Sequence, residues 1–279
     1  MADSLRGVDI SHWNKPNLSL IQKDNVSFLI AKCSEGTGYF SEDFKSQYNG
    51  AKEQGAIVGG YHYYKPYFNP TNQAKHFIKS LQTCWKVGDL PPIIDVEDTD
   101  WKRLTPIDHA HGLKVMVDLV EKAFGVKPII YTGYYYWIDA LGNSNLFKDN
   151  SLWVAQYSKK LTVKEFGGFG KPKIWQHSQG GKILGTSPID LDIFFGDGKD
   201  LFALAGVQNY IPKGDSSRTL AVQNALNLSE SRLPKLDPDG DFGNLTLARL
   251  NEWQLKNGFN KAESLTPNAW MKLFNFKYL

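Results

Sequence analysis

The sequence predicts an α/β protein: a closed (β/α) barrel of the TIM type, followed by a small all-α domain of three helices. Over the first two-thirds of the 279 residues, short apolar segments with the period of strands alternate with amphipathic helical stretches. Such alternation is typical of a mainly parallel sheet, and eight strands suggest that the sheet closes on itself. A doubly wound open sheet is the alternative, but the chain has no glycine-rich strand-to-helix turn of the nucleotide-binding type.

Each predicted strand is a short apolar segment between turn-forming residues. The eight strands are expected at Gly7–Ser11, Phe28–Lys32, Ala56–Tyr63, Pro92–Glu97, Pro128–Thr132, Leu152–Gln156, Lys173–His177 and Ile189–Phe194. Helical periodicity predicts helices at Glu42–Gln54, Pro70–Thr83 and Ile107–Phe124. The long helices are therefore concentrated in the first half of the barrel.

The pattern changes after about Gly196. Residues 196–217 have the composition of a connector, although the apolar stretch Leu201–Val207 is expected to pack back on the barrel. Three helices follow, at Arg218–Leu228, Leu245–Asn257 and Pro267–Phe274, and Thr266 is expected to cap the last of them. We therefore expect a barrel at 1–207, a linker at 208–217 and a three-helix domain at 218–279.

The composition argues against several classes of function. The formal net charge is only +3, and no basic run interleaved with aromatics occurs, so nucleic acid is not an expected partner. No apolar run approaches the ~18 residues of a membrane span, and the first residues carry no signal segment, so we expect neither membrane insertion nor a signal peptide. Cys33 and Cys84 belong to no CxxC pair or metal-spaced cluster and are expected to be ordinary thiols.

Carboxylates follow or lie within several predicted strands. Asp95 and Glu97 are two residues apart at the end of an apolar strand, so both project to one side, with Cα atoms roughly 6.5 Å apart. Asp9 and Asp190 occupy similar places on the first and eighth strands, which are neighbours in a closed barrel. Because active sites lie at the carboxyl ends of barrel strands, these four acids should meet at one mouth. Crowded like charges raise the pKa of at least one carboxyl, as acid-assisted glycoside cleavage requires.

Other side chains near the strand ends are consistent with a sugar ligand. Lys32 and Glu35 follow the second strand and are expected to orient the site, whereas His62 fits a ligand contact and a core position equally well. The histidines lack metal-ligand spacing, and Asp237–Asp241 lacks the glycine and glutamate of a calcium loop, so no metal is expected. Aromatic rings suit the apolar faces of sugars, although each ring taken alone also suits the core. The aromatics on or just after strands are Trp13, Tyr61, Tyr63, Tyr131, Trp153, Tyr157 and Trp175.

Eight motifs, in order over residues 5–196, resemble glycoside hydrolase family 25, the muramidases also called Chalaropsis-type lysozymes. They are GVDIS at 7–11, AKCSEGTGY at 31–39, GGYHYY at 59–64, PPIIDVE at 91–97, PIIYTG at 128–133, LWVAQY at 152–157, IWQHSQGGKILG at 174–185 and IDLDIFFG at 189–196.

This resemblance implies a flattened barrel and a catalytic set of Asp9, Asp95, Glu97 and Asp190. Glu97 would be the general acid that protonates the departing sugar oxygen. Asp95 would stabilise the developing positive charge or orient the substrate's N-acetyl group as an internal nucleophile, while Asp9 and Asp190 tune the pair. The implied substrate bond is the β-1,4 link from N-acetylmuramic acid to N-acetylglucosamine, and no cofactor is expected.

Three positions depart from the family pattern. Cys33 stands where a small residue is usual, and His177 stands where tyrosine is common. Asp192 occupies a place often taken by asparagine, so Asp192 is a candidate for substrate contact or for the role of Asp190.

Residues 218–274 resemble the three-helix peptidoglycan-binding domain of many wall hydrolases, through the stretch Leu236–Leu247, Trp253-Gln254, Asn257–Phe259 and Thr266–Trp270. A wall-binding unit would raise the local substrate concentration for the catalytic unit. Together with the missing signal segment, this arrangement resembles a bacteriophage endolysin, made in the host cytoplasm and released to the wall by a holin. The expected partner is bacterial peptidoglycan, and a monomer is expected.

Two rival functions stay open. One is a chitinase-like N-acetylglucosaminidase, but that motif reads D-x-x-D-x-D-x-E, and Ile93 stands where the acid two residues before Asp95 should be. The other is an inactive wall-binding protein, which the intact acidic set argues against. An amidase or peptidase would need a metal cluster or a Cys/His nucleophile pair.

Overall fold

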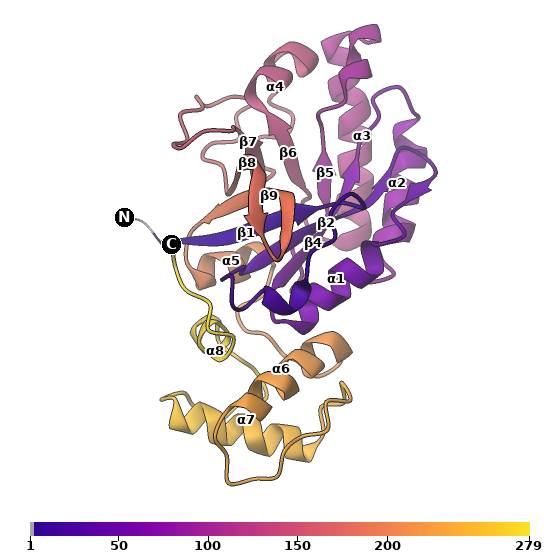
Figure 1. Cartoon of the computed structure of the whole chain (residues 1–279). Coiled ribbons are helices and arrows are strands. Elements are labelled where there is room, and N and C mark those ends of the chain that lie inside the picture. The colour runs from indigo at the N-terminus through magenta and orange to yellow at the C-terminus, as the bar shows by residue number, and fades with distance from the viewer. Residues whose placement is uncertain (1–2) are drawn as a thin grey trace.

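The computed structural model describes residues 3–279 and contains a closed barrel of eight strands (Figure 1). Each strand pairs with the next in the order β1-β9-β8-β7-β6-β5-β4-β2, and the pairing of β1 with β2 closes the ring. The strands are β1 (Ser4–Ile10), β2 (Phe28–Glu35), β4 (Ile57–Tyr63), β5 (Ile93–Asp95), β6 (Ile129–Gly133), β7 (Leu152–Ala155), β8 (Ile174–Ile183) and β9 (Thr186–Phe195). A short extra strand, β3 (Tyr39–Phe40), pairs with the end of β2. The predicted α/β barrel and its eight strands are confirmed.

The last barrel strand runs in the opposite direction to its neighbours. Strands β1, β2 and β4 to β8 are mutually parallel, but β9 is antiparallel to both β8 and β1. Asp190 therefore reaches the mouth from the first half of β9, and the expectation that it lies at a carboxyl strand end is wrong. Its expected proximity to Asp9 is confirmed, because the two residues are direct register partners.

Five helices accompany the barrel. They are α1 (Phe44–Glu53), α2 (Pro70–Leu81), α3 (Pro106–Phe124), α4 (Tyr134–Leu141) and α5 (Gly198–Leu204). Figure 1 shows α1, α2 and α3 together along one side of the barrel, beside β2, β4 and β5. Asn69 and Thr105 cap α2 and α3 through their side chains, and each is followed by a proline at the first helical position. These boundaries match the three predicted helices, whereas α4 and α5 were not predicted as helices.

The strands on the helix-covered side are buried on both faces. In β2, Phe28, Leu29, Ile30 and Ala31 are all fully buried, because alternate side chains point into the barrel and against the helices. His62 in β4 is also fully buried, where its ring contacts Ser34 at 2.9 Å and Gln73 at 3.4 Å. Burial lowers the pKa of His62 to about 3. This histidine is a core residue, which settles the alternative left open by the sequence.

The remaining helices lie at the opposite end from the mouth. They are α6 (Ser216–Leu228), α7 (Asn244–Lys256) and α8 (Pro267–Leu273), close to the predicted ranges, and Figure 1 shows them below the barrel. The indole of Trp270 in α8 donates a 2.9 Å hydrogen bond to the carbonyl of Gly55, just before β4. Gly55 has φ +85, and a Cβ there would lie 2.3 Å from the Phe274 ring, so only glycine allows this close approach.

A buried ion cluster also joins α6 to the base of the barrel. Asp89 precedes β5 and accepts from Lys52 at 2.9 Å and from Arg218 at 2.6 Å, and all three side chains are almost fully buried. Asp215 lies 3.3 Å from the same two cations. Tyr210 is buried too, and its backbone pairs with Leu265. Within the expected linker, residues 208–217, Tyr210, Pro212 and Asp215 are therefore buried at this junction, whereas most of the other residues are exposed.

Two further expectations concern the connector and the thiols. Leu201 and Phe202 of α5 are buried, which confirms that this apolar stretch packs back on the barrel. Cys33 and Cys84 are buried free thiols, as expected.

Between residues 3 and 279, no helix has both the length and the apolarity needed to cross a bilayer. Residues 1 and 2 of the expected barrel domain lie outside the described residues.

Candidate active site

The four predicted acids meet in one cavity at the mouth of the barrel. This cavity has a volume of about 200 Å³. It is lined by Asp9, Tyr61, Asp95, Glu97, Tyr131, Trp153, Tyr157, Gln176, Gln179 and Asp190. Asp9, Asp95 and Asp190 come from β1, β5 and β9, and Glu97 follows β5 directly. The closed barrel thus brings together acids that are up to 181 positions apart in the chain.

The crowding of these acids favours their protonated forms. Burial raises the pKa of Asp95 well above its usual range, and the charge of Glu97 adds to the effect. Burial likewise raises the pKa of Asp9, helped by the charges of Asp192 and Asp190. Glu97 lies at the rim, in contact with solvent, yet desolvation by the surrounding groups raises its pKa as well. Asp190 repels ionised Glu97, whereas the Tyr131 hydroxyl and Lys32 act in the opposite direction.

A hydrogen-bond network centred on Gln176 connects three of the side chains that line the cavity. Gln176 in β8 donates from Nε2 to Asp9 Oδ2 at 2.7 Å. Its Oε1 accepts from the hydroxyls of Tyr131 at 2.8 Å and Tyr157 at 3.1 Å. One buried amide therefore orients a carboxylate and two phenols. Gln176 is not among the residues predicted for the site, although a polar residue in the middle of an apolar strand is a usable signal.

Asp192 lies deeper than the other acids. It is fully buried, and its Oδ1 accepts from the Trp153 indole at 2.8 Å, while Oδ2 has no hydrogen-bond partner. Burial raises the pKa of Asp192 to about 8. Asp190, not Asp192, lines the cavity, and the neighbours of the Asp192 carboxyl are Asp9 and the Trp153 indole.

A charged cluster borders the cavity at the ends of β2 and β4. Lys32 donates to Glu35 at 2.7 Å, and Lys65 lies 3.2 Å from Glu35 and 2.7 Å from Asp98. Both ammonium groups lie 4.9 Å from the centre of the Tyr63 ring. Desolvation acts to raise the pKa of Glu35, but the two lysines outweigh it and lower that pKa. Lys32 also favours the ionised forms of Asp95 and Glu97.

The predicted aromatic residues occupy four different places, one of which is the charged cluster that contains Tyr63. Tyr61, Tyr131 and Tyr157 line the cavity with Trp153. Trp13 is 83% exposed and does not line the cavity; its ring lies against His12 at an interplanar angle of 41°, and His12 in turn lies beside Tyr39. Trp175 lies elsewhere: its ring stacks on Phe195 and its indole donates to the carbonyl of Gln156 at 2.7 Å. Because neighbouring strand residues face opposite sides, Gln176 enters the cavity and Trp175 does not, so we replace Trp175 with Gln176 in the candidate set.

This arrangement is suited to glycoside cleavage by paired carboxyls. A carboxyl kept protonated beside ionisable neighbours can donate a proton to a leaving oxygen, and a second can stabilise a developing oxocarbenium charge. Among residues 3–279, no group of three or more His, Cys, Asp or Glu side chains is arranged to hold a metal ion.

Known proteins share both the sequence and the fold of this chain. An N,O-diacetylmuramidase of Chalaropsis sp is 31% identical over 189 residues, which are 63% of this chain and 88% of that protein. The autolytic lysozyme of Clostridium acetobutylicum is 29% identical over 256 residues, or 90% of this chain and 72% of that protein. The structure of a muramidase from Trichobolus zukalii matches with a TM-score of 0.66 and 31% identity, and covers 73% of this chain and 100% of that one.

The family model described as glycosyl hydrolases family 25 matches residues 8–186. Nine of the ten residues that line the cavity lie in this range, and Asp190 lies just beyond it. This match spans more than half of the chain, and the fold agrees with the solved relatives. The protein is therefore a glycoside hydrolase and belongs to glycosyl hydrolases family 25.

Proposed function

We propose that the protein is a muramidase, which hydrolyses the β-1,4 bond from N-acetylmuramic acid to N-acetylglucosamine in bacterial peptidoglycan. The observation that carries this proposal is the set of carboxyls in the mouth of a family 25 barrel, with the pKa of Glu97 raised at the rim. The names of the relatives, lysozyme and muramidase, support the same bond.

Glu97 is the proposed general acid. It is the most exposed acid of the set and its pKa is raised, so it can stay protonated and still reach a sugar oxygen. A carboxyl with its ordinary pKa of 4.5 would already be ionised near neutral pH. Asp190 opposes this ionisation by its charge, which assigns to Asp190 a role in tuning Glu97.

Asp95 is the proposed partner on the substrate side. Its side chain is buried and lines the cavity, and its Oδ1 accepts no hydrogen bond from the protein. In that position Asp95 stabilises the positive charge that develops on the sugar or orients the N-acetyl group that attacks it. Asp9 accepts a hydrogen bond from Gln176, which fixes the position of its carboxyl beside the other acids.

The C-terminal helices are part of the same proposal. We assign α6 to α8 to binding of the wall, on the strength of the motifs in residues 236–270, and an endolysin role follows if both units act on peptidoglycan. The helices are fixed to the barrel base by the Asp89 cluster and by Trp270. Wall contact through α7, the helix farthest from the barrel in Figure 1, would leave the mouth free for substrate.

The test is turnover of purified peptidoglycan by wild type, Glu97→Gln and Glu165→Gln. Glu97→Gln keeps the size of the side chain but cannot donate the proton, so we expect at least a 10³-fold loss of cleavage with unchanged folding and wall binding. Glu165 is exposed and outside the cavity, so its variant should cleave like wild type. Near-normal turnover by Glu97→Gln would overturn the assignment. A wild-type protein that binds walls and never cleaves them would favour the inactive wall-binding alternative.

A further inference from the structure

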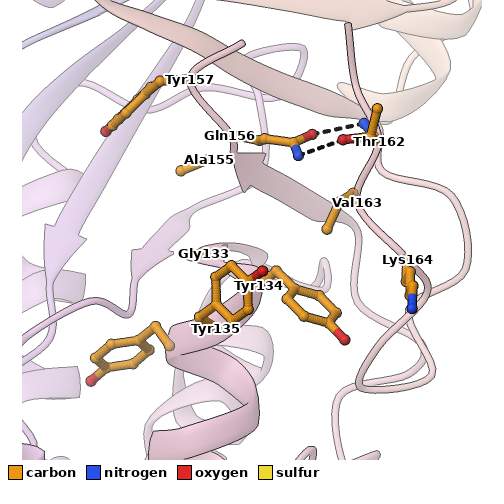
Figure 2. A pocket seen from close by; sticks show the side chains of 10 residues that line it. Gly133, Tyr134, Tyr135, Ala155, Gln156, Tyr157, Thr162, Val163 and Lys164 are labelled. Carbon is orange, nitrogen blue, oxygen red and sulfur yellow. Dashed lines mark hydrogen bonds between the residues drawn. The ribbon is translucent and has the colours of Figure 1, made fainter.

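A second pocket, of about 630 Å³, lies beside the catalytic cavity (Figure 2). It is formed by the start of α4, the end of β7 and the loop that follows β7. Tyr157 lines both spaces, so the pocket is a direct neighbour of the cavity. Figure 2 shows Val163 and Lys164 on the loop side and Tyr134 and Tyr135 on the helix side. Tyr157 is therefore the side chain that a ligand would pass if it reached from the cavity into this pocket.

The loop wall of the pocket is held in place by a paired amide contact. Gln156 Nε2 donates to Thr162 Oγ1 at 2.9 Å, and Gln156 Oε1 accepts from the Thr162 backbone at 2.8 Å, as drawn in Figure 2. The carbonyl of Gln156 accepts from the Trp175 indole. Trp175 thus helps to fix the backbone of Gln156, which lines this pocket. Because this contact already ties Thr162 to the end of β7, less order has to be imposed on the loop when a ligand binds.

The two spaces differ in charge. The catalytic cavity holds four carboxyls and is therefore poorly suited to a carboxylate of the ligand. Among the ten residues that line the larger pocket there is no acid, and Lys164 is the cation. The rest of the lining combines tyrosine rings and hydroxyls with the apolar Val163. Such a surface suits a ligand that carries a carboxylate, peptide groups and small apolar side chains.

We propose that this pocket binds the peptide that muramic acid carries on its lactyl group. This inference rests on the proposed muramidase function, since only that substrate brings a peptide to the cavity. The sugar to be cleaved occupies the acidic cavity, and its peptide branch passes Tyr157 into the larger pocket. There Lys164 pairs with a carboxylate of the peptide, and Val163 and Tyr135 contact its small apolar side chains.

The test compares two substrates with one enzyme series. The substrates are solubilised glycan strands with their peptides, and the same strands after an amidase has removed every peptide. The variants are Lys164→Met, Tyr135→Ala and the control Lys159→Met, whose lysine lies on the same loop but does not line the pocket. Tyr135 is 79% exposed, so its truncation should leave the fold intact. We expect Lys164→Met to lower kcat/KM about fivefold, mainly through KM, on peptide-bearing strands only.

The outcomes separate the proposals. A loss of equal size on both substrates would mean that the pocket binds sugar, and unchanged kinetics on both would mean that it binds neither; each result overturns the peptide assignment. Binding provides a readout that does not depend on cleavage. In the Glu97→Gln background, a disaccharide with its peptide should bind more tightly than the bare disaccharide, and Lys164→Met should reduce that difference about fivefold. A wild type that cleaves neither substrate while this binding difference persists would contradict the muramidase proposal alone.

Discussion

The Asp89→Asn variant tests whether the C-terminal helices are rigidly attached to the barrel. Asp89 is 1% exposed and accepts hydrogen bonds from Tyr48, Lys52, Arg218 and the backbone of Lys86. Asparagine keeps the shape, but it removes the charge and turns an NH₂ group toward one of the donors. Lys52 and Arg218 then stay buried, with only Asp215 at 3.3 Å as a counter-charge.

The magnitude follows from the burial of the cluster. Removal of one partner from a buried ion pair costs about 3–5 kcal/mol. We expect the lower end, about 3 kcal/mol, because Asp215 still faces both cations. For a chain of this size, that loss corresponds to a drop in Tm of roughly 6–12 °C. Once the junction is loosened, trypsin should also cut faster after Lys213, which lies in the segment between the two units.

The assay is thermal and urea unfolding, with limited trypsin digestion, of wild type, Asp89→Asn and Asp118→Asn. Asp118 pairs with Lys114 at 2.5 Å on the exposed face of α3, and the loss of such a pair costs under about 0.5 kcal/mol. If Asp89→Asn unfolds at the same temperature as Asp118→Asn and resists trypsin equally well, the claim of a rigid, ion-locked junction is wrong.

Two further predictions concern the site. Asp192→Asn should raise the free energy of unfolding at pH 8 and flatten its pH dependence. The pKa of Asp192 in the folded protein, about 8, exceeds the ordinary value of 3.8. The stability that Asp192 contributes is therefore full below about pH 3.8 and is lost as the pH rises to about 8. Urea unfolding at pH 4.5 and pH 8 measures this, and an unchanged slope between the two would refute it. Gln176→Leu should cost about 3 kcal/mol of unfolding free energy, because Asp9, Tyr131 and Tyr157 each lose a hydrogen bond inside the site. Gln179→Leu, at an exposed position of the same cavity, is its control. Equal stability of the two variants would contradict the claim that the hydrogen bonds of Gln176 stabilise the site.

The barrel and its acidic mouth could be predicted because both depend on local patterns. Apolar strand segments alternate with helical ones, and the acids Asp9 and Asp95 end their strands. Ring closure then brings the first and last strands together, which places Asp9 opposite Asp190 without knowledge of the direction of β9. That direction itself is set by the tight β8–β9 hairpin, whose turn at Leu184-Gly185 lies between two long strands.

Other features depend on contacts that periodicity does not reveal. Whether Trp175 or Gln176 enters the cavity depends on which face of β8 points inward. A shift of one residue in the predicted register exchanges the two side chains. Helix α4 begins with three tyrosines and a tryptophan, residues of middling helix propensity, and it forms because Trp137 packs against Phe147 and Phe169. The segment 208–217 reads as a linker by composition, yet Tyr210 and Asp215 are buried through partners far away in the chain.

The nature of the new chain ends tests the central claim most directly. Purified peptidoglycan would be digested with the wild-type protein, reduced with borohydride and analysed by mass spectrometry. We expect reduced muramic acid at the new ends, and none when Glu97→Gln replaces the wild type. Reduced glucosamine at those ends would show that the other glycosidic bond is cut, and it would contradict the proposed specificity.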